Sequence, residues 1–276
     1  MEQIMTKCYG MIVAGTTGTS KDGQEVLSRN ISDHLSIITL DDGTHYLNID
    51  VATKGGIEIA KKAGLGSSGV ADVIMTRYLY NAATLFEETG HTGRCFTVLR
   101  HPVDRAIAVF HSLKRNNVKA VADMSLHQYA ESNLSEDNWM VRMITNTMTE
   151  KLTQHHLQVA KEVIGRKCMV GFIDNNKKFE ETMERYTKFF RWEHVHSINT
   201  HHIVGTTATD TGIDEKQACA TKLIKTGVNR HQYERVDGKS EAWQLLKARN
   251  LLDLDLYNYA EALYVKQAIV YEEMER

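Results

Sequence analysis

The chain has 276 residues, of which 42% are hydrophobic and 25% charged, and its formal net charge is −2. This composition is typical of a globular protein that can bury a sizeable core, and the near-neutral charge excludes a general attraction to nucleic acid or to an anionic membrane. No stretch reaches the roughly 18 apolar residues of a membrane-spanning helix, and the first residues lack a signal-peptide pattern, so we expect a soluble chain.

The first part of the chain, residues 1–115, alternates short apolar runs with helical periodicity. Apolar side chains at Met1, Ile4, Met5 and Cys8 recur with the spacing of a helix. Strands are expected at 10–14, 35–40, 45–51, 70–75 and 94–99, the last of them buried. Helices are expected at 56–63, which Gly64 and Gly66 end, at 78–87 and at 102–114.

The second part, residues 116–276, has mostly helical patterns. Helices are expected at 126–133, 138–147, 153–164, 179–190, 240–249 and 253–273, and one strand at 168–173. Residues 194–238 are polar and poorly periodic, which indicates an irregular surface segment. Strands that alternate with helices predict an α/β fold with a mainly parallel sheet, built as a single domain over residues 1–276.

Cysteines and histidines do not predict a metal centre. Four cysteines (Cys8, Cys95, Cys168, Cys219) lie far apart without a C-x-x-C pair, which argues against a zinc ribbon and leaves distant pairing open. Four histidines (His194, His196, His201, His202) cluster, but no carboxylate or cysteine supports them at ligand spacing. We therefore expect no metal site. Four basic residues of the irregular segment are interpreted as a solvated stretch, with contact to an anionic ligand as the alternative: Lys222, Lys225, Arg230 and Arg235.

The turn between residues 99 and 103 carries the clearest chemical signal. The chain's single proline, Pro102, stands where a buried strand ends and a helix begins, the position at which proline is favoured. An apolar stripe from Val103 to Leu113 is expected to pack on the sheet, leaving the first-turn amides beside Arg100. Amide donors, the positive end of the helix dipole and an arginine together form an anion site. The alternative is that Arg100 is merely exposed at a sheet edge.

A set of motifs in a fixed order extends this signal over roughly residues 45 to 270. They are the segments 93–106 (GRCFTVLRHPVDRA), 46–50, 71–74, 138–142 (NWMVR), 160–163 with 170–174, and 238–243 (GKSEAW) with Asn250, Asp253, Leu256 and Tyr257. The chain resembles sulfotransferases in these motifs, most closely the carbohydrate-type group that includes the uronosyl 2-O-sulfotransferases and related algal proteins. Segment 93–106 resembles the family's 3′-phosphate-binding segment.

The resemblance implies a P-loop NTPase-like, three-layer α/β fold with an α/β nucleotide-binding part at 1–115 and a helical C-terminal half. The implied cofactor is 3′-phosphoadenosine 5′-phosphosulfate (PAPS), and the implied reaction moves a sulfuryl group to a hydroxyl of a carbohydrate or similar acceptor. Cofactor-binding positions carried over are Arg100, His101, Pro102, Arg105 and Ala108. The family usually works in the Golgi lumen behind an N-terminal anchor, so that compartment is expected if an anchor precedes this chain.

Two departures from the family pattern bear on activity. At Ala108 the family has a serine whose hydroxyl also holds the 3′-phosphate, and its loss costs about 1.5–3 kcal/mol of binding. The family's 5′-phosphosulfate loop has no convincing counterpart, since residues 15–21 carry their lysine after the glycines and residues 53–56 are interpreted as a turn. One hypothesis is that the natural reading frame begins upstream. The alternative is a nucleotide-binding protein without turnover.

The general base for the acceptor hydroxyl is also in question. The uronosyl enzymes use a histidine on the strand before the 3′-phosphate segment, and the nearest counterpart here is Asp72. A carboxylate can serve as a base if burial raises its pKa. The alternative interpretation of Asp72 is a solvated strand end or a helix cap.

Overall fold

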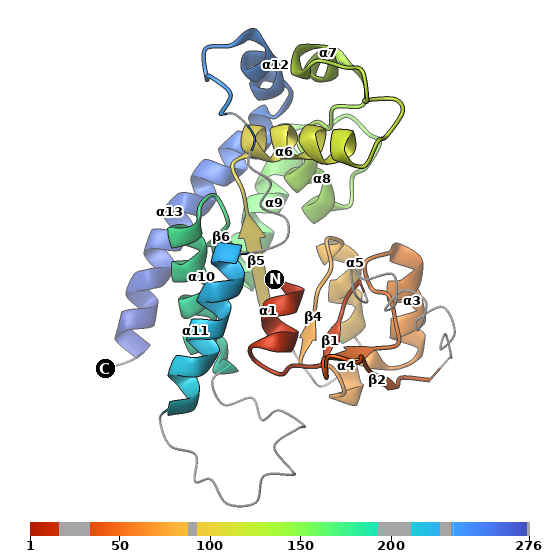
Figure 1. Ribbon diagram of the computed structural model, residues 1–276, viewed down its shortest axis with the longest axis vertical. Coiled ribbons are helices and arrows are strands. Elements are labelled where there is room, and N and C mark those ends of the chain that lie inside the picture. Colours follow the sequence, from red (N-terminus) through yellow and green to blue (C-terminus); the bar gives the residue numbers. More distant parts are fainter. Residues whose placement is uncertain (17–33, 88–92, 193–210, 227–232, 234, 275–276) are drawn as a thin grey trace, which may run out of the picture. The chain divides into compact units, whose positions relative to one another are not determined.

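Figure 1 shows the protein as a computed structural model, which describes residues 1–16, 34–87, 93–192, 211–226, 233 and 235–274. The chain forms two compact units, each built from two separate stretches of sequence. The first unit comprises Met1–Arg94 and Glu180–Gly227, and the second comprises Cys95–Phe179 and Val228–Arg276.

The first unit holds a four-stranded sheet in the order β2–β3–β1–β4. Its strands are β1 (Val13–Ala14), β2 (Ile37–Thr39), β3 (His45–Leu47) and β4 (Val73–Ile74). β1 is parallel to both of its neighbours, whereas β2 is antiparallel to β3. The α/β class is confirmed, but the sheet is mixed, because the few residues between β2 and β3 allow a hairpin and not a crossover.

The helices of the first unit differ widely in length, from 4 to 16 residues. They are α1 (Glu2–Lys7), α3 (Lys54–Lys62), α4 (Leu65–Ser68), α5 (Leu79–Ala83), the 3₁₀ turn η1 (Thr84–Phe86), most of α10 (Asn176–Phe190) and α11 (Thr211–Thr226). Ile57 of α3 is fully buried in a core cluster with Leu47 and Leu85. Gly64 follows α3 with φ +73°, a conformation in which glycine carries no Cβ penalty, so the predicted stop is confirmed.

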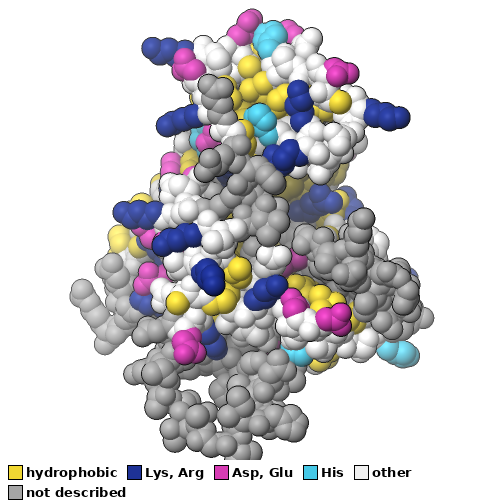
Figure 2. Space-filling model, in the orientation of Figure 1, with side chains coloured by type: hydrophobic (Ala, Val, Ile, Leu, Met, Phe, Trp, Pro, Cys, Tyr) yellow, Lys and Arg dark blue, Asp and Glu magenta, His cyan; other side chains and the backbone are white. Residues whose placement is uncertain are grey.

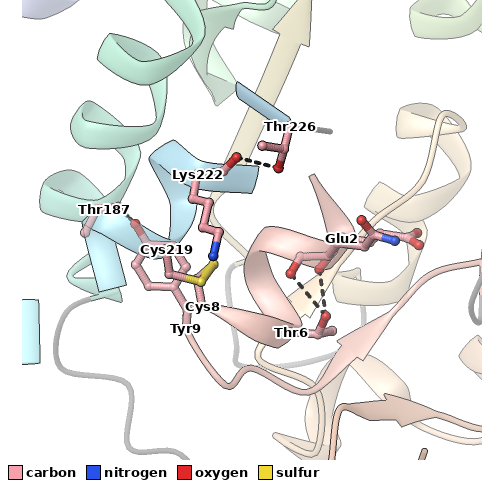
Figure 3. The surroundings of a disulfide bond; sticks show 9 residues. Glu2, Thr6, Cys8, Tyr9, Thr187, Cys219, Lys222 and Thr226 are labelled. Atoms are coloured by element: carbon pink, nitrogen blue, oxygen red, sulfur yellow. Dashed lines mark hydrogen bonds between the residues drawn. A yellow bond between two sulfur atoms is a disulfide. The ribbon is translucent and has the colours of Figure 1, made fainter. Parts of the chain in front are cut away.

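Helix α11 corrects the expectation of an irregular segment at 194–238. Residues 211–226 form a helix that buries Ala220 and Ile224. The interspersed threonines and lysines obscured this narrow apolar face in the sequence. Figure 3 shows how α11 is joined to the end of α1 by the disulfide Cys8–Cys219. Next to it, the Tyr9 hydroxyl lies 2.6 Å from Thr187 Oγ1 of α10.

The second unit pairs two parallel strands and adds helices of 6 to 24 residues. The strands β5 (Cys95–Leu99) and β6 (Cys168–Phe172) are also joined by a disulfide, Cys95–Cys168. The helices are α6 (Pro102–Arg115), α7 (Leu126–Glu131), α8 (Trp139–Thr145), α9 (Gln154–Lys167), α12 (Glu241–Arg249) and α13 (Leu251–Met274). β6 is buried throughout, but β5 is fully buried only at Leu99, so the expectation of a buried strand at 94–99 is wrong for most of its residues.

The apolar stripe of α6 packs on helices and not on the sheet as expected. Val103 and Ile107 form a cluster with Ala130 of α7 and Leu246 of α12. Periodicity predicts that one face of a helix is buried, but the partner of that face depends on the path of the whole chain. Within the described residues no helix is both long and apolar enough to cross a bilayer.

Candidate anion-binding pocket

The turn from β5 into α6 is held by an aspartate that follows β6. His101 is the N-cap residue of α6, with φ −51° and ψ 125°, and Pro102 occupies the first helical position. The backbone amide of His101 donates to Asp174 Oδ1 at 2.8 Å. Because β5 and β6 are parallel neighbours, Asp174 and His101 leave the same edge of the sheet. The aspartate therefore fixes the point at which the chain enters the helix.

The same aspartate ties α13 to this edge. The hydroxyl of Tyr257 donates to Asp174 Oδ2 at 2.6 Å. Burial raises the pKa of the Tyr257 phenol, and the hydrogen bond to Asp174 raises it further, so the phenol remains a donor at physiological pH. The ring of Tyr257 meets the His101 ring edge-on, with centroids 5.5 Å apart.

A pocket of about 580 Å³ opens beside the first turn of α6. It is lined by residues of α6, of α12 and of the segment before α12: His101, Asp104, Ile107, Tyr233, Arg235, Val236, Asp237, Gly238 and Trp243. The rings of His101 and Trp243 are nearly parallel, with an angle of 19° and centroids 6.4 Å apart. Figure 2 shows apolar, histidine and charged side chains interspersed over this end of the second unit, around α6, α7 and α12.

Arg100 lies next to the pocket and has no carboxylate partner among the described residues. Its Nη2 donates to the hydroxyl of Tyr233 at 2.9 Å, and its Nε is buried without an acceptor in the described part of the chain. Nor do the described residues supply an acceptor for the amides of Val103 and Asp104 in the first turn of α6. Arg100 and the α6 amides are the donors that the sequence predicted for an anion.

His101 also has an uncommitted polar atom. Its Nδ1 is buried without a hydrogen-bond partner in the described region, and the nearest carboxylate oxygen, Asp104 Oδ2, lies 3.8 Å away. Arg235 adds an exposed positive charge at the pocket wall, and Asp104 and Asp237 add two exposed carboxylates. The pocket thus combines aromatic faces with charged side chains of both signs.

Arg105 is engaged elsewhere. Its Nη2 pairs with Glu136 Oε2 at 2.7 Å, and its guanidinium carbon lies 3.8 Å from the centre of the Trp139 ring. Ala108, one turn further along α6, is half-buried and does not line the pocket. Of the five cofactor positions carried over from the resemblance, only His101 lines the pocket. Arg100 contacts Tyr233, which lines it, and Pro102 is buried at the start of α6.

Asp72 belongs to the first unit and serves its sheet. Its Oδ2 accepts from the amide of Ile12 at 2.8 Å, next to the pairing of β1 with β4. This bond agrees with the interpretation of Asp72 as a residue at a strand end. The turn at Thr53 is likewise structural, because Thr53 Oγ1 caps the Gly56 amide of α3 at 3.0 Å.

The remaining sequence candidates are the glycine- and threonine-rich segment and the possible metal ligands. Residues 17–21 of the glycine- and threonine-rich segment and the histidines at 194–202 fall in the ranges that the structure does not describe. Within the described ranges, no group of three or more histidine, cysteine or acidic side chains could hold a metal ion.

Three residues at the site were not predicted as site residues. Asp174 and Trp243 stand inside motifs of the resemblance, but nothing in the sequence shows that they meet at α6. Tyr233 stands in a segment without periodicity, 133 residues from Arg100, and no local signal identifies it. Comparisons of the chain with protein-family models, with curated proteins and with solved structures find no match.

Proposed function

We propose that this protein is a sulfotransferase-like enzyme that transfers a sulfuryl group from PAPS to a hydroxyl of a carbohydrate or similar acceptor. In this proposal the pocket beside α6 receives the nucleotide, and Arg100 binds its 3′-phosphate. The proposal includes a P-loop NTPase-like fold.

The observation that carries the proposal is the state of Arg100. A guanidinium that is partly buried usually pairs with a carboxylate, because burying a charge without compensation is costly. Here Nε lacks an acceptor among the described residues and Nη2 meets only a neutral hydroxyl. The first-turn amides of α6 also lack acceptors among the described residues, and in this proposal one anion with several oxygens binds both sets of donors.

The pocket's size and lining support a nucleotide as that anion. A volume of about 580 Å³ is within the range of small-molecule sites, and Trp243 offers an aromatic face on which a base can stack. Inorganic sulfate or phosphate would fill only a small part of this space.

The strand order of the first unit supports the proposed fold. β1 has β3 on one side and β4 on the other, so the chain changes direction across the sheet at β1. The carboxyl end of such a strand is where open α/β sheets bind ligands. Gly15 follows β1 at this end, at the start of the glycine- and threonine-rich segment.

A nucleotide-binding protein without turnover is the second candidate. It is favoured by the hydrogen bond of Asp72 to the Ile12 amide, which occupies the carboxylate that the sequence offered as general base. Both candidates require the same 3′-phosphate site, so binding is tested first and catalysis second.

Calorimetric titration with adenosine 3′,5′-bisphosphate tests the site. We expect binding to the wild-type chain and at least 10-fold weaker binding of 5′-AMP, which lacks the 3′-phosphate. Arg100→Met should weaken the bisphosphate by about 10- to 100-fold and leave 5′-AMP nearly unchanged, since one charge-assisted hydrogen bond is removed. Arg115→Met, at the exposed end of the same helix, is the matched control. Equal affinity of Arg100→Met and wild type would refute the site.

Transfer of labelled sulfate from PAPS to a panel of polysaccharides then separates the two candidates. An enzyme should label at least one acceptor, and Arg100→Met should lower the rate. Bisphosphate binding without transfer to any acceptor would favour the protein without turnover.

A further inference from the structure

The Tyr233 hydroxyl accepts a hydrogen bond from Arg100, the side chain that the proposed function assigns to the 3′-phosphate. The hydroxyl lies 2.9 Å from Arg100 Nη2, and the tyrosine ring lines the pocket. The ring also stacks on His111 of α6, with centroids 4.4 Å apart and an angle of 15° between planes. Tyr233 thus has two polar or aromatic contacts, one with the Arg100 guanidinium in the turn before α6 and one with the His111 ring on α6.

An incoming anion can replace the hydrogen bond to Arg100 but not the stacking on His111. The hydroxyl is a neutral acceptor that takes a single hydrogen bond, whereas a phosphate is negatively charged and can accept two parallel hydrogen bonds from the guanidinium. A phosphate would therefore displace the hydroxyl from Arg100. The stacking on His111 and the apolar contacts of the ring with the Val103 cluster do not involve Arg100, so the ring keeps a support when its hydroxyl is displaced.

We propose that Tyr233 is an internal competitor for the anion site, whose hydroxyl occupies Arg100 in the free protein and is displaced by the ligand phosphate. This inference rests on the proposed function, and it names Tyr233 as the residue whose hydroxyl lowers the affinity of the site for its ligand.

Tyr233→Phe separates competition from ligand contact, because the two roles predict opposite signs. Phenylalanine keeps the ring, its stacking on His111 and its place in the pocket, and removes only the hydroxyl. If the hydroxyl competes, adenosine 3′,5′-bisphosphate should bind about 3- to 10-fold more tightly to the variant. If the hydroxyl contacts the ligand, binding should weaken. Tyr129→Phe makes the same chemical change at a fully buried tyrosine outside the pocket and should leave affinity unchanged.

A double variant ties the effect to Arg100. In Arg100→Met the donor is absent, so adding Tyr233→Phe should produce no further gain in affinity. Titration with inorganic phosphate as well as with the bisphosphate reports on the anion site without the base.

The outcomes distinguish this inference from the proposed function. Tighter binding to Tyr233→Phe that disappears without Arg100 supports both. Wild-type binding with equal or weaker binding to Tyr233→Phe overturns the competitor role and leaves the nucleotide site standing. Inorganic phosphate that binds Tyr233→Phe more tightly, with no preference for the bisphosphate, supports the competitor and overturns the nucleotide. No binding of either anion to any variant overturns both.

Discussion

Arg100 and Arg105 stand in one motif but have different surroundings. Among the described residues, the polar partner of Arg100 is the neutral Tyr233 hydroxyl, whereas Arg105 lies between the Glu136 carboxylate and the face of Trp139. An arginine stacked on tryptophan and paired with a carboxylate has satisfied its charge within the fold. The roles of these two arginines are therefore decided by their partners and not by the residue type, which is the same.

Arg105→Met should reduce stability more than it reduces binding. It removes a cation–π contact and a half-exposed ion pair, so we expect the free energy of unfolding to fall by about 1–2 kcal/mol. Bisphosphate affinity should stay within about twofold, since the side chain is already engaged. Urea unfolding and calorimetry measure the two quantities, and Arg115→Met again controls for loss of a charge on α6. A drop in affinity as large as that of Arg100→Met would show that Arg105 leaves Glu136 to bind the ligand.

Helices α8 and α13 cap each other. Asn138, at φ +45° before α8, accepts with its Oδ1 from the amides of Leu252 and Asp253 in the first turn of α13. In return, the Asp253 carboxylate accepts from the amides of Met140 and Val141 in the first turn of α8. The first-turn amides of each helix, which have no acceptor within their own helix, thus donate to a side chain at the start of the other helix. The motif residues at 138–142 and 250–253 are accounted for by this contact, which places α13 beside the strands.

Asp253 should make the stability of the second unit depend on pH. Burial raises the pKa of its carboxyl from 3.8 to about 6, although the two amides favour the charged form. The folded state then holds the proton more tightly than the unfolded state does. The free energy of unfolding should therefore fall as the pH rises from about 4 to about 6, by up to about 3 kcal/mol, and change little above that.

Asp253→Asn removes this titration. Urea unfolding followed between pH 4 and pH 7 should lose the part of the slope that Asp253 contributes. Asp255→Asn, two residues along α13 and exposed, should keep the full slope. The same pH profile in Asp253→Asn and in wild type would show that the carboxyl has an ordinary pKa and that burial does not dominate it.

Two disulfides stabilise the molecule as a whole, one in each unit. Cys8–Cys219 spans 211 residues and joins the two stretches of sequence that build the first unit. Cys95–Cys168 spans 73 residues and joins β5 to β6. A crosslink that closes a long loop removes much of the freedom of the unfolded chain. Because α11 is linked to α1 by the first bond, that bond also decides how firmly α11 is attached.

Removing Cys8–Cys219 should destabilise the first unit and release α11. The double variant Cys8→Ser/Cys219→Ser should lower the free energy of unfolding by up to about 5 kcal/mol. Hydrogen exchange should increase most in α11, whereas Cys95→Ser/Cys168→Ser should leave the exchange of α11 unchanged. Protection of α11 that survives the loss of Cys8–Cys219 would mean that its apolar contacts alone hold it.

The sequence by itself determined the elements whose signal is local. The single proline and the apolar spacing predicted α6, the Met1–Cys8 spacing predicted α1, and Gly64 marked the end of α3. The turn at Arg100 was also local, since a strand end, a proline and an arginine are adjacent in the chain. In each case neighbouring residues carry both the pattern and the backbone preference that it reports.

Only the tertiary structure decided which distant side chains meet. Tyr233 comes to Arg100 and Asp174 to His101 across long stretches of sequence, and the cysteine pairs and the mutual caps of α8 and α13 do the same. Local periodicity says that a face is buried or that a donor needs an acceptor, but many residues could satisfy either need. The path of the whole chain selects one, because burial of apolar surface is not directional and leaves the choice of partner to packing.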